Sequence, residues 1–379
     1  MSIRGPVRAL LGAAVLAVGV SCHRAPSPAQ VGLGFPTHRI LPLVETFAGA
    51  LVSADGRPIR IEVDTFRFPP ATTYQAAEVG RAARLAAQAD MVGVVGHSGS
   101  RETLMSAPIY DAAHQPFLAA MATSRRLRSA GPWVFQLAPD DSVEGEYIGR
   151  FVAERLRARS VTIFYVVDEY GIGLRDGLVA ALGARHIAVR DTVPVGTRGA
   201  CPMNQPLNAY RATVDAALAR GVPDAIVLAT RQVEAACIVN QVRHHLPAAR
   251  FVAGDGLLAN NEFFELVGRS ADSVYIAAFW HPDSPDSTSR DFVQRFRTRF
   301  PGETPDYSDA MIYDALTTMV EALRAAGSDR EQVRRFLVSL GHERPALNGV
   351  TGPITFPARA DRLLMTRVRG MGLVLVPFP

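Results

Sequence analysis

Short apolar runs alternate with amphipathic stretches along most of this 379-residue chain. Apolar or β-branched runs of strand length occur at 31–35, 59–64, 91–95, 117–120, 161–167, 187–193, 225–229 and 250–253. Stretches with helical spacing separate them at 40–51, 74–89, 102–113, 173–182, 208–220 and 232–244. Strands that alternate with helices form parallel sheets covered by helices on both faces, so the pattern predicts an α/β fold. The length favours two such units over one core.

The last third of the chain has a different pattern. It contains amphipathic stretches at 291–300 and 308–326, and a third helical stretch at 330–339. Gly327-Ser328-Asp329 is typical of a helix end followed by the cap of the next helix. The runs at 349–356 and 365–376 then predict strands.

Two loops rich in hydroxyl groups follow neighbouring strands of the predicted sheet. His97-Ser98-Gly99-Ser100 follows the run at 91–95, and Ala122-Thr123-Ser124 follows the run at 117–120. Each loop directly precedes a helical turn, where free N–H groups and the helix dipole favour negative charge. The two loops therefore predict a site for a small polar ligand.

Composition narrows the possible functions. The formal net charge is only +4, and the arginines are scattered rather than arranged in a stripe with aromatic residues, which argues against nucleic-acid binding. The chain contains no Cys-x-x-Cys or His-Glu-x-x-His pattern. We therefore expect no metal and no cofactor.

The N-terminus is typical of an export signal. Arg4 and Arg8 precede an apolar run at 9–20 that is too short for a mature transmembrane helix. Gly19-Val20-Ser21-Cys22 is similar to a bacterial lipoprotein cleavage box, although Gly19 replaces the usual larger aliphatic residue. This predicts a signal peptide at 1–21, lipid on Cys22, a tether at 22–29, and a location in the periplasm or on the outer face of the envelope. Ordinary cleavage, without lipid, is the alternative.

Two further cysteines, Cys201 and Cys237, remain in the predicted mature chain. An exported protein with two cysteines favours a disulfide between them, and two separate thiols are the alternative.

Two incomplete motifs bear on catalysis. Gly32-Leu33-Gly34 begins like a dinucleotide-binding fingerprint, but Thr37 occupies the position of the third glycine. Gly96-His97-Ser98-Gly99-Ser100 approaches a nucleophile elbow, but Ser100 occupies the position of the final glycine. We therefore do not expect an enzyme.

Four stretches, in order along the chain, resemble the type I periplasmic binding proteins of the leucine/isoleucine/valine-binding group, which serve ABC importers. They are Gly96–Ser100 with Ala107-Pro108-Ile109-Tyr110; Ala122-Thr123 with Leu127 and Gly131; Asp168-Glu169-Tyr170-Gly171-Ile172-Gly173; and Tyr313-Asp314-Ala315 with Asn348-Gly349-Val350-Thr351-Gly352-Pro353-Ile354-Thr355-Phe356. The resemblance implies two Rossmann-like lobes joined by a three-crossover hinge. Lobe 1 would comprise 30–138 and 278–344, and lobe 2 would comprise 139–277 and 345–379. The lobes would close around a ligand.

The resemblance also implies roles for individual residues. Ser100, Ala122 and Thr123 match positions that hold a ligand carboxylate. Tyr170 matches an aromatic residue that faces the cleft, and Asp255 matches the acid that pairs with a ligand ammonium. Each position has a structural alternative: helix caps for Ser100 and Thr123, local packing for Tyr170, and an Asp-Gly turn for Asp255.

Three departures from the family pattern affect the predicted pocket. Arg231 replaces an aromatic residue, Met121 replaces a small one, and the loop at 35–39 is short and lacks an aromatic contact. The expected ligand is therefore a small amino acid or related carboxylate, delivered to an ABC transporter permease. If Arg231 points inward, acidic ligands should be preferred; a solvated surface position is the alternative. A lipid-anchored sensing or envelope-assembly role, without transport, is the alternative function.

Overall fold

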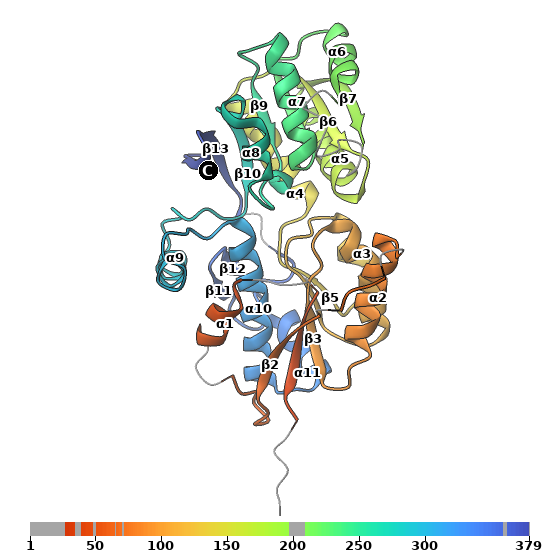
Figure 1. The fold of residues 1–379 in the computed structure, drawn as a ribbon, viewed down its shortest axis with the longest axis vertical. Coiled ribbons are helices and arrows are strands. Elements are labelled where there is room, and N and C mark those ends of the chain that lie inside the picture. Colours follow the sequence, from red (N-terminus) through yellow and green to blue (C-terminus); the bar gives the residue numbers. More distant parts are fainter. Residues whose placement is uncertain are drawn as a thin grey trace, which may run out of the picture.

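The first of two α/β lobes is built on a five-stranded parallel sheet. The computed structural model describes residues 27–34, 39–47, 51–64, 66–69, 72–196, 209–358 and 362–378, and the two lobes lie end to end (Figure 1). The sheet has the order β2-β1-β3-β4-β5. Its strands are β1 (Ala29–Leu33), β2 (Ile59–Val63), β3 (Met91–Val95), β4 (Phe117–Ala119) and β5 (Val134–Gln136).

The second lobe contains a seven-stranded sheet with the order β14-β13-β10-β9-β8-β6-β7. Five of its strands are parallel, and the last two join as an antiparallel hairpin on β10. The strands are β6 (Ser160–Val166), β7 (Ala188–Val195), β8 (Ala225–Ala229), β9 (Phe251–Ala253), β10 (Val274–Ala278), β13 (Leu364–Arg369) and β14 (Gly372–Val376).

Helices cover both sheets. Those of the first lobe are α1 (Leu41–Phe47), α2 (Tyr74–Ala86), α3 (Ser100–Ala112), α9 (Ser287–Arg299), α10 (Tyr307–Ala326) and α11 (Arg330–Ser339), with the 3₁₀ turn η1 (Arg125–Ser129). Those of the second are α4 (Asp141–Glu154), α5 (Glu169–Gly183), α6 (Arg211–Ala219), α7 (Gln232–His245) and α8 (Glu262–Val267), with η2 (Asp255–Leu257) and η3 (Gly268–Ala271).

The central strands are buried on both faces. Every residue of β3, β4, β8 and β9 is buried, which explains why these strands appear in the sequence as continuous apolar runs. The alternation of strands and helices thus gave the correct architecture, and the predicted α/β fold with two Rossmann-like lobes is confirmed.

The chain passes between the two sheets three times: from β5 to α4, from β10 to α9, and from the hairpin of β11 (Leu347–Gly349) and β12 (Gly352–Ile354) to β13. The run at 349–356 was expected to be one strand, but Gly352 takes a positive φ of 102° and the chain reverses there. Asp314 of α10 accepts hydrogen bonds from the backbone of Val350 and Thr351. The hairpin therefore packs on the first lobe, and we propose a boundary after it rather than at 345.

Glycines bring α4 and α5 into close contact. A Cβ on Gly145 of α4 would lie 2.6 Å from the backbone of Gly177 on α5, and a Cβ on Gly149 would lie 2.8 Å from the side chain of Ala181. Backbones can approach this closely only where side chains are absent. This packing holds the N-termini of α4 and α5 side by side at the junction with the first lobe (Figure 1).

Several predictions fall on residues outside the described ranges. These are the signal peptide, the lipidated Cys22, most of the tether, the short loop at 35–38 and Cys201. Cys237 lies buried in α7, so the disulfide remains a prediction. In the ranges that the structure does describe, we find no helix both long and apolar enough to cross a membrane.

Candidate functional site

A small cavity lies where loops of the two lobes meet. Its volume is about 40 Å³, which leaves space for only a few water-sized groups. It is lined by Ser98, Gly99, Ser100, Met121, Thr123, Tyr170, Arg231, Asp255, Gly256, Ala259 and Tyr307. Five of the six residues singled out as ligand contacts are among them. The sixth, Ala122, is buried and is not among the lining residues, and its carbonyl accepts a hydrogen bond from Gln136.

The first lobe contributes the two hydroxyl-rich loops. Ser100 begins α3, and its Oγ accepts a hydrogen bond from the backbone N–H of Ser124, at 3.2 Å. The N-cap of η1 is Ser124, whose side chain accepts from the backbone of Arg126, so Thr123 is not the cap. The carbonyl of Thr123 instead accepts from the backbone N–H of Asp141, at 2.8 Å, where the chain enters α4. The loops therefore support each other and leave the Thr123 side chain at the cavity.

The second lobe contributes Asp255 from a loop shaped by its flanking glycines. A Cβ on Gly254 or on Gly256 would lie 2.6 Å or less from an atom of Tyr170 or Leu174. The hydroxyl of Tyr170 accepts a hydrogen bond from the N–H of Gly256, at 2.9 Å. The loop is thus more than an Asp-Gly turn, because its glycines let it pack directly on Tyr170 and present Asp255 to the cavity.

Tyr307 is a cavity residue that the sequence did not indicate. It begins α10, where Asp306 and Asp309 form a capping box. Its hydroxyl donates to Oδ2 of Asp255 at 2.8 Å, which joins the first lobe to the second. Oδ1 of Asp255 is buried and has no donor at full hydrogen-bond geometry among the described residues, although the side chains of Tyr170 and Glu144 lie close enough to interact with this carboxyl. One oxygen of this carboxyl therefore remains available to a ligand donor.

A group of buried acids surrounds Asp255. Oε1 of Glu144, on α4, accepts from the backbone N–H of Asp255 at 2.7 Å, and Asp141 lies one turn earlier on the same helix. Burial raises the pKa of Glu144 and of Asp141 well above the usual range, and raises that of Asp255 to about 6. The hydroxyls of Tyr307 and Tyr170, and the charge of Arg231, lower the pKa of Asp255 without offsetting burial. A cationic group at Oδ1 would stabilise its ionised form.

Arg231 points into the cavity rather than to open solvent. Its side chain is 26% exposed, and its Nε and Nη2 donate to Oδ2 of Asp168 at 3.1 and 2.9 Å. Its guanidinium carbon lies 5.3 Å from the centre of the Tyr170 ring. The Asp168 carboxylate favours the charged guanidinium, and the pKa of Arg231 is raised although burial opposes this.

The pKa of Asp255 makes ligand affinity depend on pH. An ammonium binds the ionised carboxylate, so a proton leaves when ligand binds near pH 6. We expect full affinity above this pH and a loss of up to about tenfold per pH unit below it. The pKa of Asp255 is higher in the folded protein than in the unfolded chain. The ligand-free protein should therefore become less stable as pH rises from about 4 to about 6. Titration calorimetry across this range, in buffers of different ionisation enthalpy, measures both ligand affinity and proton release. A ligand affinity that does not change with pH would contradict this role of Asp255.

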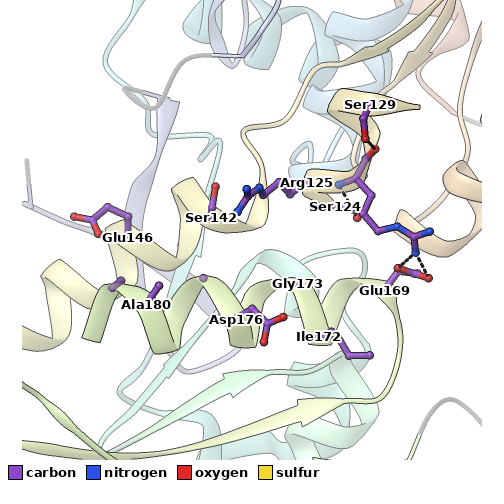
Figure 2. A pocket seen from close by; sticks show the side chains of 13 residues that line it. Ser124, Arg125, Ser129, Ser142, Glu146, Glu169, Ile172, Gly173, Asp176 and Ala180 are labelled. Carbon is purple, nitrogen blue, oxygen red and sulfur yellow. Dashed lines mark hydrogen bonds and ion pairs between the residues drawn. The ribbon is translucent and has the colours of Figure 1, made fainter. Parts of the chain in front are cut away.

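A larger groove of about 580 Å³ lies between η1 and the helices α4 and α5 (Figure 2). Nη1 of Arg126 bridges its two sides by pairing with both carboxylate oxygens of Glu169 at 2.7 Å. The pair is exposed, and such pairs contribute about 0–1 kcal/mol. Asp255 lines the smaller cavity instead, together with Ser100, Thr123, Tyr170 and Arg231, so we assign the candidate site there. In the part of the chain that is described, no group of three or more His, Cys, Asp or Glu side chains could hold a metal ion.

Solved structures that superpose on this chain include binding proteins. Leucine binding protein LivK from Thermotoga maritima superposes with a TM-score of 0.77 at 19% identity, covering 93% of this chain and 98% of that one. LivJ from Streptococcus pneumoniae, a branched-chain amino acid transporter substrate binding protein solved in complex with isoleucine, gives a TM-score of 0.74 at 19% identity, covering 92% and 99%.

Sequence comparisons lead to the same group. An amino acid binding protein of Pseudomonas aeruginosa is 24% identical over 257 residues, covering 66% of this chain and 64% of that relative, so the chain spans slightly under two thirds of it. Leu/Ile/Val-binding protein homolog 1 of Brucella abortus is 21% identical over 272 residues, covering 71% and 68%. The family described as periplasmic binding protein matches residues 45–372. The chain therefore belongs to the periplasmic binding protein family and is a type I member, of the group that includes the Leu/Ile/Val-binding proteins.

Proposed function

We propose that this protein captures a small amino acid between its two lobes outside the cytoplasm and delivers it to an ABC importer. One observation carries the proposal: Asp255 lines a cavity between the lobes, and its buried Oδ1 has no donor at full hydrogen-bond geometry among the described residues. A buried carboxylate is costly unless it is paired, so an ammonium is the natural occupant.

The opposite wall of the cavity suits a carboxylate. Ser100 opens α3, and Thr123 lies just before η1, so the free N–H groups of two helical turns lie near both side chains. An α-amino acid would then join a carboxylate site on the first lobe to an ammonium site on the second. Ligand would favour the closed state because only that state brings both sites within reach of one molecule.

Coupling to a permease rests on the relatives, several of which have names that refer to transport. A sensing or envelope-assembly role without transport is the second candidate, and no feature of the cavity favours it. We further propose removal of residues 1–21 with lipid attachment at Cys22, and a Cys201–Cys237 disulfide within the second lobe. Both follow from the sequence pattern.

Titration calorimetry of the mature protein tests the proposed ligand class. The panel comprises L-serine, L-threonine, L-asparagine, L-alanine, L-leucine, L-aspartate and succinate, which lacks an ammonium group. We expect micromolar or tighter binding, about −8 kcal/mol or better, for at least one amino acid and none for succinate. Binding of succinate in preference to every amino acid would refute the ammonium site, and absence of any binding would refute the proposed ligand class.

A further inference from the structure

Asp168 both pairs with Arg231 and caps helix α5. The side chain of Asp168 is 6% exposed, and its Oδ2 accepts from Nε and Nη2 of Arg231. Its Oδ1 accepts from the N–H of Gly171 at 2.9 Å, as the N-cap of α5. Because the same carboxylate caps a helix, it cannot turn away from Arg231 without leaving that N–H unsatisfied. The guanidinium therefore has its counter-ion before any ligand arrives.

One nitrogen of Arg231 is left to donate. Within the described residues, Nη1 has no hydrogen-bond acceptor, whereas Nε and Nη2 both bond Asp168. The guanidinium lies beside Gly99 of the first lobe, since a Cβ there would be 3.7 Å from both Nη1 and Nη2. Arg231 thus extends from the second lobe to the loop that precedes α3, and it can offer an N–H to a ligand side chain.

The charges around Nη1 disfavour a second ligand carboxylate. Glu102 lies near enough to raise the pKa of Arg231, and its Oε2 is 2.8 Å from the position of a Cβ on Gly99. Asp168 already balances the guanidinium, and Asp255 lies on the same cavity. A carboxylate side chain would add negative charge to a poorly solvated site without a free cation to pair with. A hydroxyl or amide oxygen would accept from Nη1 without that penalty.

Two large side chains narrow the space beside Arg231. Met121 and Tyr307 line the same cavity as Arg231, and Ala259 completes its wall. Met121 occupies a position where the sequence pattern of the family has a small residue. A branched aliphatic side chain would have to displace these groups and would leave Nη1 without an acceptor.

We propose that the Arg231–Asp168 pair determines specificity, and that the protein selects amino acids with small, uncharged, hydrogen-bond-accepting side chains, such as serine, threonine or asparagine. This inference rests on the proposed amino-acid function. It differs from the sequence-based expectation that acidic ligands would be preferred if Arg231 points inward. Because Asp168 already balances the charge of Arg231, we expect Arg231 to recognise the ligand side chain by a hydrogen bond rather than by charge.

Competition calorimetry with L-serine, L-alanine, L-leucine and L-aspartate tests the proposal. In the wild type we expect L-serine to bind about ten- to hundredfold more tightly than L-alanine, which lacks only the hydroxyl. L-aspartate and L-leucine should both bind more weakly than L-serine. Arg231→Met should reduce the preference for serine over alanine toward one.

Asp168→Asn tests the proposal more specifically. Asparagine is also a good N-cap, so α5 should be preserved, but Arg231 loses its negatively charged partner. We expect the ratio of aspartate to serine affinity to rise at least about tenfold. Thermal unfolding checks that the variant folds, and Arg231→Met provides an independent test if it does not. An unchanged ratio in Asp168→Asn, or tighter wild-type binding of leucine or aspartate, would overturn the specificity proposal while leaving amino-acid binding intact. Failure of every amino acid to bind would overturn both proposals.

Discussion

Replacing Asp255 with asparagine is expected to weaken amino-acid binding by about 30-fold to several thousandfold. This range corresponds to about 2–5 kcal/mol for loss of one member of a buried, hydrogen-bonded charge pair. Asparagine keeps nearly the same shape, and its amide oxygen can still accept from the Tyr307 hydroxyl. The change therefore removes the negative charge that an ammonium requires while preserving the contact between the lobes. Titration calorimetry with the tightest-binding amino acid of the panel measures the loss.

Ser100→Ala is the matched comparison on the opposite wall. It removes one neutral hydroxyl, whose Oγ already accepts from Ser124, so the expected loss is about 1 kcal/mol or about fivefold. Ligand-free Asp255→Asn should melt at or above the wild-type temperature, because the desolvated carboxyl next to Glu144 is replaced by a neutral group. Equal affinities for wild type and Asp255→Asn would move the ammonium site elsewhere.

The largest expected effect on stability is that of Asp314→Ala, at about 3–5 kcal/mol. Asp314 is 1% exposed, and its carboxylate accepts from the backbone of Val350 and Thr351 and from the Thr351 hydroxyl, at 2.6 to 2.8 Å. Its charge also faces Arg362, whose Nη1 donates to the carbonyl of Leu137. Alanine would leave these donors without their acceptor, beside two of the segments that connect the lobes.

Urea unfolding followed by circular dichroism measures the free energy of unfolding of Asp314→Ala. Glu321→Ala on the same helix is the control, because it removes only a half-exposed pair with Arg324 that contributes about 0–1 kcal/mol. A loss for Asp314→Ala no larger than that of the control would contradict the role assigned to the buried carboxylate.

Apolar periodicity predicted the architecture because parallel strands buried on both faces require continuous apolar runs, as at 91–95 and 225–229. The hairpin at 347–354 was not predicted as a hairpin. Its reversal depends on Gly352 and on hydrogen bonds to Asp314, which lies 36 residues or more away in sequence. Periodicity carries no information on such a long-range contact.

Site residues in loops that follow strands could be predicted from the sequence. Contacts that bring residues from distant parts of the sequence together could not. Ser100, Thr123 and Asp255 follow strands of their own lobes, so local pattern and family resemblance placed them at one edge. Tyr307 reaches Asp255 across the junction, and Glu144 supports it from a neighbouring helix. The acids at 306 and 309 signal the start of α10, yet nothing local shows which loop Tyr307 meets. The pairing of Arg231 with Asp168 lies within the second lobe, but it joins residues 63 positions apart in sequence, so no local pattern indicates it.

The most direct test of the central claim is a crystal structure of the protein with the tightest-binding amino acid of the panel. We predict the ligand ammonium within hydrogen-bond distance, about 3 Å, of Oδ1 of Asp255. Its carboxylate should face Ser100 and Thr123 from the other side of the same cavity. A ligand bound in the groove beside Arg125, or one in the cavity with its carboxylate toward Asp255, would contradict the account.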